Sequence, residues 1–107
     1  MKVHVNKLGS WTILVTVGRV DAHTSPDLES AIQSQLGAGA SQVAIDLTEV
    51  EYMSSSGLRV LLSTLKQLGK AAGKMALVHP RENVREVLDI SGFSNIFRLV
   101  GHSDELA

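Results

Sequence analysis

The sequence predicts a single α/β domain with a mostly parallel sheet of four to five strands, one of them antiparallel. Three observations predict this class. The chain opens with two strand-like alternating stretches around a turn, helical stripes then alternate with short apolar runs, and 107 residues suit one domain. Because parallel strands need crossover connections, the expected element order is β-β-α-β-α-β-α-β.

The first two strands are expected to form an antiparallel hairpin. Apolar and polar residues alternate over 2–6 and again over 11–17, and residues 7–10 between them are typical of a turn. The second strand has one apolar face and one threonine-rich face. The sequence leaves open whether the threonine-rich face is solvated or covered by something smaller. The two faces are Trp11, Ile13, Val15 and Val17, and Thr12, Leu14 and Thr16.

A helix is predicted next, with a start signal at its amino end. Thr24 supplies a hydroxyl cap, Pro26 has a φ preset for a helix, and Asp27 places an acid at the positive end of the helix dipole. Gly37 and Gly39 end this helix. Residues 43–47 then form a short apolar run, which is typical of a strand covered on both faces.

The second helix has the strongest periodicity in the chain. Its leucine stripe is closed by Gly69 and Gly73, and a strand is expected over 74–79. A third helix opens at Pro80 and ends near Gly92, followed by a last strand over 96–100. We expect residues 101–107 to form a loose tail, so that one domain spans 1–107. The leucine stripe is Leu58, Leu61, Leu62, Leu65 and Leu68.

Composition excludes several classes of function. Ten basic against eleven acidic residues give a net charge of −1, so the chain has no basic field for nucleic acid or an anionic membrane. Without cysteine there is no disulfide, thiol catalysis or cysteine-based zinc site. The four histidines lack metal-ligand spacing, and no apolar run approaches the ~20 residues of a membrane helix. We expect a cytoplasmic protein without metal or cofactor.

The candidate functional residues follow the second and third strands. In parallel sheets, sites gather beyond the carboxyl ends of strands, which here places loops at 18–24 and 46–57. Asp21, His23 and the three serines 54–56 share one surface if these strands are neighbours. One serine suffices to cap the second helix, and we assign that role to Ser55 or Ser56. Gly57 is expected to let another molecule approach closely.

The three serines also fit two kinds of chemical site. A phosphate or nucleotide cradle at a helix start is one, although 4% aromatic residues leave little to sandwich a flavin ring. A serine hydrolase is the other, with Ser55, Asp89 and His102 in suitable order. Its motif lacks the first glycine, His102 lies in the expected tail, and a chain of this length leaves little room for a substrate pocket. An enzyme is therefore disfavoured.

Several segments resemble the STAS domain family, and within it the stand-alone anti-sigma factor antagonists. In this family, a kinase that is also an anti-sigma factor phosphorylates the first serine of an Asp-Ser-Ser-Gly segment. The resemblance places the phosphoacceptor at Ser55 and a kinase contact at Asp21. The family aspartate is Ser54 here, which makes Ser54 a competing acceptor, with Ser56 as another. The segments are residues 18–24, 43–47, 53–58 and 80–93 with Ile96 and Phe97.

The resemblance implies a regulatory binding protein that is not an enzyme. The unphosphorylated form would bind a serine/threonine kinase of histidine-kinase-like ATPase fold and release its sigma factor, phosphorylation of Ser55 would abolish binding, and a metal-dependent phosphatase would reset the switch. The alternative is a STAS domain that is never phosphorylated and acts as a ligand sensor or scaffold, such as a lipid-transport accessory subunit or a signalling-complex component. The expected partner surface comprises Asp21, His23, Thr24, Ser54, Ser55, Ser56, Gly57 and Leu58.

Overall fold

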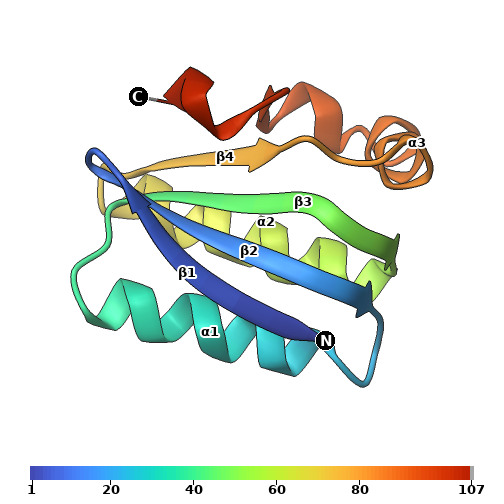
Figure 1. Ribbon diagram of the computed structural model, residues 1–107, viewed down its shortest axis with the longest axis horizontal. Coiled ribbons are helices and arrows are strands. Elements are labelled where there is room, and N and C mark those ends of the chain that lie inside the picture. The colour runs from blue at the N-terminus through green and yellow to red at the C-terminus, as the bar shows by residue number, and fades with distance from the viewer. Residues whose placement is uncertain (107) are drawn as a thin grey trace.

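One five-stranded sheet organises the computed structural model, which describes residues 1–106 (Figure 1). The strand order is β1-β2-β3-β4-β5; β1 pairs antiparallel with β2, and every other pair is parallel. The predicted fold class and element order are confirmed. The elements are β1 (Lys2–Leu8), β2 (Trp11–Val20), α1 (Ser25–Gly37), β3 (Gln42–Met53), α2 (Ser55–Lys70), β4 (Lys74–Val78), α3 (Glu82–Ile90), the 3-10 turn η1 (Phe93–Asn95), β5 (Arg98–Val100) and the 3-10 turn η2 (Ser103–Leu106).

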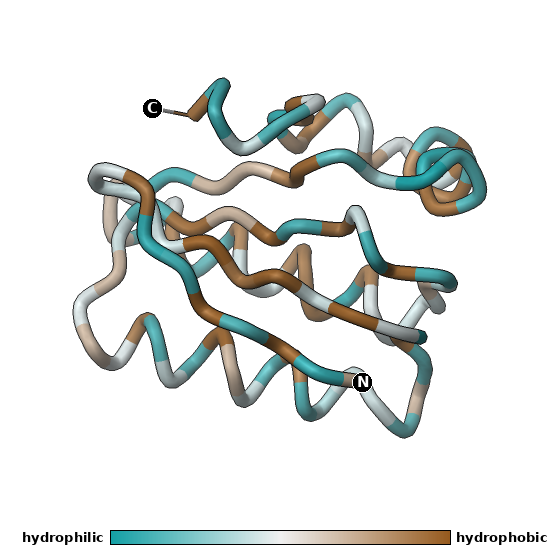
Figure 2. The backbone as a smooth tube through the Cα atoms, in the orientation of Figure 1, coloured by the Kyte–Doolittle hydropathy of each residue, from teal (hydrophilic) through white to brown (hydrophobic). Residues whose placement is uncertain are grey.

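The main hydrophobic core lies between the sheet and the three α-helices. Figure 2 shows that the middle strands carry many hydrophobic residues. Side chains on one face of these strands pack against the apolar stripes of the helices. The threonine-rich face of β2 belongs to this core: Leu14 and Thr16 are fully buried. The question that the sequence left open is thereby answered, because helices cover this face. Core residues from the helices include Leu28, Ile32, Leu61, Val84 and Leu88.

The opposite face of the sheet carries a smaller core. Trp11 and Ile13 of β2 pack there with Ala44, Ala76 and Val78 of the neighbouring strands. Its cover is the carboxyl-terminal segment: η2 places Leu106 in this cluster, where only 7% of the residue is exposed. The expectation of a loose tail over 101–107 is therefore wrong for residues 103–106, because burial of Leu106 holds the segment; Ala107 lies outside the described residues.

Strand β3 is much longer than the apolar run that predicted it. It continues to Met53, so most of the expected loop over 46–57 is strand. Two irregularities in the pairing with β2 each insert one extra residue in β3, and the buried side chains after position 46 consequently recur every third residue, at Leu47, Val50 and Met53. Beyond its last pairing with β4, at Asp46, carbonyls of β3 accept hydrogen bonds from side chains at the start of α3.

Within residues 1–106, no helix combines the length and the apolar character needed to cross a bilayer. Helix α2, with 16 residues, carries a buried stripe on one side and polar side chains on the other.

Candidate functional site

The serine segment follows β3 and opens α2. Ser54 is the N-cap residue: its hydroxyl oxygen accepts a hydrogen bond from the backbone N–H of Gly57 at 3.3 Å. The prediction that Ser55 or Ser56 would cap the helix is wrong. The reason is the length of β3, which ends at Met53 and leaves Ser54 as the flanking residue with extended backbone.

Because Ser54 caps α2, the hydroxyl of Ser55 is not needed for capping. Ser55 is the first residue of α2 and its side chain is exposed, and no hydrogen bond joins its hydroxyl to any group in residues 1–106. Ser56 is half-buried beside α1. Of the three serines, Ser55 is the exposed one, and Ser54 and Ser56 are partly covered.

Gly57 and Leu58 lie inside the protein. A Cβ atom on Gly57 would come within 2.3 Å of Met53 Sδ and 2.7 Å of Val20 Cγ1, so only glycine lets α2 begin this close to the strands. Leu58 is 9% exposed and belongs to the main core. The expectation that Gly57 lets another molecule approach closely is wrong, because the residue is buried against the strands. Gly57 and Leu58 instead hold the first turn of α2, and with it the serines, against the core.

The loop after β2 is organised by Asp21. Its Oδ1 atom accepts hydrogen bonds from the backbone N–H groups of His23 at 2.9 Å and Thr24 at 3.1 Å. The N–H of Thr24, followed by that of His23, lowers the pKa of the Asp21 carboxyl from its ordinary value, since both favour the carboxylate. The hydroxyl of Thr24 donates to the carbonyl of Arg19 at 2.7 Å and does not cap α1, so that prediction is wrong.

The two loops are adjacent. Strands β2 and β3 are parallel neighbours, Val20 is paired with Met53, and the N–H of Ser54 donates to the Val20 carbonyl at 2.8 Å. Asp21 directly follows Val20, and Ser55 lies two residues after Met53. Figure 1 shows both strand ends at one edge of the molecule, together with the starts of α1 and α2. Asp21 is half-buried and His23 is exposed. We call the edge that carries Asp21, His23 and Ser55 the rim.

A groove runs from this rim between α1 and α2. Its volume is about 280 Å³, and Glu29 of α1 and Arg59 of α2 contribute its charged side chains. Sequence reasoning missed Arg59. The available signal was its spacing, because a residue four positions after Ser55 lies on the same side of a helix. The full lining is Ser25, Pro26, Glu29, Ser56, Arg59, Val60 and Ser63.

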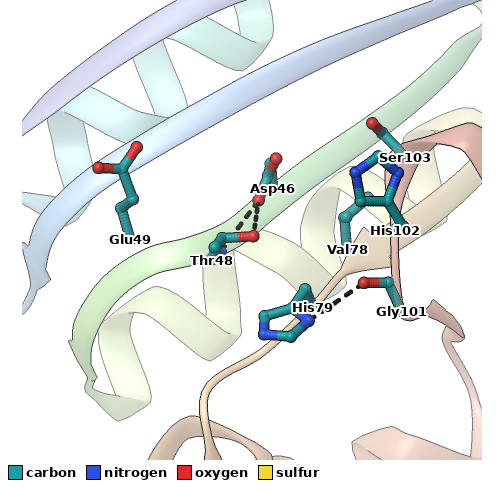
Figure 3. A pocket seen from close by; sticks show the side chains of 8 residues that line it. All are labelled: Asp46, Thr48, Glu49, Val78, His79, Gly101, His102 and Ser103. Carbon is teal, nitrogen blue, oxygen red and sulfur yellow. Dashed lines mark hydrogen bonds between the residues drawn. The ribbon is translucent and has the colours of Figure 1, made fainter.

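A second hollow, of about 390 Å³, lies where β3, β4 and the carboxyl-terminal segment meet (Figure 3). Its polar groups are largely paired with their neighbours. Asp46 accepts from the N–H and hydroxyl of Thr48, and His79 Nδ1 is 3.1 Å from the Gly101 carbonyl oxygen. None of the three serines lines it. Its lining is Asp46, Thr48, Glu49, Val78, His79, Gly101, His102 and Ser103.

The hydrolase arrangement does not form. Asp89 pairs with Arg85 at 3.0 Å and accepts a hydrogen bond from Ser94, while His102 lies 3.3 Å from Asp104. Neither is hydrogen-bonded to Ser55, so neither is placed to act as a base on its hydroxyl. Among the described residues there is also no cluster of three or more histidine, aspartate or glutamate side chains that could hold a metal ion.

The chain is similar to known proteins over nearly its whole length. The model of the STAS domain family matches residues 2–106. The chain is 37% identical over 107 residues to BtrV of Bordetella bronchiseptica, which is named as a candidate anti-sigma factor antagonist; the match covers 100% of this chain and 91% of that protein. An anti-sigma factor antagonist from Mycobacterium paratuberculosis is 28% identical, with a TM-score of 0.88, covering 97% of this chain and 88% of that one.

The fold is also shared with a protein solved in two states. The anti-sigma factor antagonist SpoIIAA in its unphosphorylated form aligns with a TM-score of 0.84 and 20% identity, covering 98% of this chain and 92% of that one. The phosphorylated form of the Bacillus protein SpoIIAA aligns with a TM-score of 0.76 and 20% identity, covering 98% and 96%. At this identity the likeness establishes a common fold.

Proposed function

Because the chain belongs to the STAS domain family, we propose that it is an anti-sigma factor antagonist switched by phosphorylation of Ser55. The relative at 37% identity and the Mycobacterium structure carry names that support the antagonist role. The observation that carries the switch is the exposed hydroxyl of Ser55 at the head of α2, on the rim that also holds Asp21. The role is one of regulated binding, in the cytoplasm, without catalysis by this chain.

Ser55 is the best acceptor of the three serines for physical reasons. A kinase must bring ATP to the hydroxyl oxygen, which forms a bond to the γ-phosphorus while the bond to the β-phosphate oxygen breaks and ADP leaves. The hydroxyl proton passes to a base of the kinase or to solvent water. Ser55 is exposed for such an approach, whereas Ser54 is half-buried and its oxygen accepts the bond that caps α2. Ser56 is half-buried against the groove.

The replacement of the family aspartate by Ser54 preserves the local structure. Serine and aspartate are both good N-cap residues because each offers a side-chain oxygen to the free N–H groups of the first turn. Ser54 fills this role through the Gly57 N–H. We therefore expect the segment to present Ser55 as an aspartate would, with one negative charge fewer beside it.

The proposed switch acts through charge at the interface. The unmodified rim binds a serine/threonine kinase of histidine-kinase-like ATPase fold, which is also the anti-sigma factor, and its sigma factor is released. A phosphate adds about −1.5 to −2 charges near neutral pH. At the start of a helix this charge is tolerated by the fold, but burying a hydrated dianion in an interface carries a desolvation cost. A metal-dependent phosphatase would restore the hydroxyl.

The test is phosphorylation by candidate kinases. Purified protein is incubated with ATP and each kinase of this ATPase class from the same genome, and the phosphate is located by mass spectrometry. We expect labelling in the parent and in Ser56→Ala, and none in Ser55→Ala. Unmodified protein should bind the kinase in a pull-down, and phosphorylated protein should not. Absence of labelling with every kinase would favour the ligand-sensing or scaffolding alternative.

A further inference from the structure

Arg59 differs from the other arginines of the chain. Four of the five arginines contact a partner group, whereas Arg59 makes no hydrogen bond, ion pair or ring contact with any of residues 1–106. Its side chain is exposed at the mouth of the groove beside α1. The engaged groups are Arg19 over the Tyr52 ring at 4.5 Å, Arg81 with the Thr48 carbonyl, Arg85 with Asp89, and Arg98 with the Glu105 carbonyl.

The position of Arg59 directs it toward Ser55. Residues four apart on a helix are neighbours, with Cβ atoms about 6 Å apart. Helical side chains also lean toward the amino end, so the guanidinium of Arg59 can reach the turn that begins with Ser55. Helix α2 contains no acidic residue to compete for it. Across the groove, Glu29 is the acid that faces Arg59, and the two form no ion pair in the described structure.

We infer that Arg59 holds the phosphate group on Ser55, an inference that rests on the proposed phosphorylation of this serine. A phosphate monoester offers three acceptor oxygens, and the planar fork of a guanidinium can donate to two of them at once. The unmodified hydroxyl offers no such charge, which explains why Arg59 is unengaged in the structure described here. Phosphorylation would therefore remove a free cation from the rim as well as add an anion to it.

The inference can be tested on protein that carries phosphate at position 55 without the use of a kinase. Phosphoserine is incorporated genetically at position 55, and the second ionisation of the phosphate is followed by ³¹P NMR across pH 4 to 9 at low salt. The compared chains are the parent, Arg59→Gln, Arg59→Lys and Lys66→Gln. Lys66 is the matched control, because it is a cation of the same helix two turns further from the phosphate.

An opposite charge in contact favours the dianion, so Arg59→Gln should raise the phosphate pKa by roughly 0.15 to 0.4. Arg59→Lys should give a smaller rise, and Lys66→Gln should leave the pKa within about 0.1 of the parent. Equal pKa values in the parent and Arg59→Gln, or equal effects of the Arg59 and Lys66 variants, would overturn the inference. Failure of every kinase to label Ser55 would count against the proposed function and would leave this titration unaffected.

Discussion

The Ser54 hydroxyl accepts the backbone N–H of Gly57, and this single hydrogen bond assigns different roles to adjacent serines. Ser54 completes the first turn of α2, and Ser55 is left exposed on that turn. Gly57 serves the same arrangement from the other side, because its missing side chain lets the turn rest on Val20 and Met53. The structure of the helix start therefore determines which of the serine hydroxyls is exposed.

Replacing the cap should lower stability without removing the acceptor. Ser54→Ala should decrease the free energy of unfolding by about 0.5–2 kcal/mol, because the Gly57 N–H loses its partner. Ser54→Asp should restore the cap and add a favourable charge of about 0.3–1 kcal/mol at the helix start. Urea denaturation measures both. If Ser54→Ala were as stable as the parent, the capping role would be contradicted; Ser55→Ala, which removes no bond, is the control.

Gly57 is expected to tolerate no side chain. Gly57→Ala places a Cβ atom 2.3 Å from Met53 Sδ, and overpacking of this kind costs about 1–3 kcal/mol. Gly69 is the matched control in the same helix, since nothing lies within 4 Å of its Cβ position. Gly69→Ala should stabilise the protein by about 0.4–1 kcal/mol. A differential scanning calorimetry series that ranked the two variants in the reverse order would refute the close-packing argument.

The loop after β2 should respond to acid through Asp21. Its carboxyl pKa is lowered in the folded protein, chiefly by the Thr24 N–H, so folding is favoured by the carboxylate. That contribution is present above the ordinary pKa of 3.8 and is lost as the pH falls through the folded value. Asp21→Asn keeps the acceptor oxygen and loses the charge. Between pH 5 and about 2, its melting temperature should fall less steeply than that of the parent, and parallel curves would contradict the assignment.

The carboxyl-terminal turn should contribute measurably to stability. Leu106→Ala removes a buried side chain from the smaller core, and we expect a loss of about 2 kcal/mol in the free energy of unfolding. Ile90→Ala is the control, because Ile90 is 88% exposed and should change stability by less than about 0.5 kcal/mol. Denaturant midpoints compare the two. Similar effects would mean that the segment is held by something other than Leu106.

The sequence predicted the element order because each helix has a clear apolar stripe and each parallel strand a short apolar run. It also placed Asp21 and the serines in loops after neighbouring strands. It could not predict the second half of β3, since the two inserted residues change the spacing of buried side chains from two to three at Leu47, Val50 and Met53. The cap was misassigned for the same reason, because the helix start depends on where β3 ends.

The sole tryptophan gives the protein a built-in fluorescent reporter for one end of the sheet only. Trp11 begins β2, buried beside Leu106 and beneath Arg98, whereas the Ser55 rim lies past the far end of that strand, about 30 Å away. The fluorescence of Trp11 should therefore change when the carboxyl-terminal turn detaches, and it should not change when a protein binds at the serines. Partner binding would have to be followed with an extrinsic dye attached near the rim. The fluorescence of Trp11 can report in the same sample whether the carboxyl-terminal turn stays packed on the sheet.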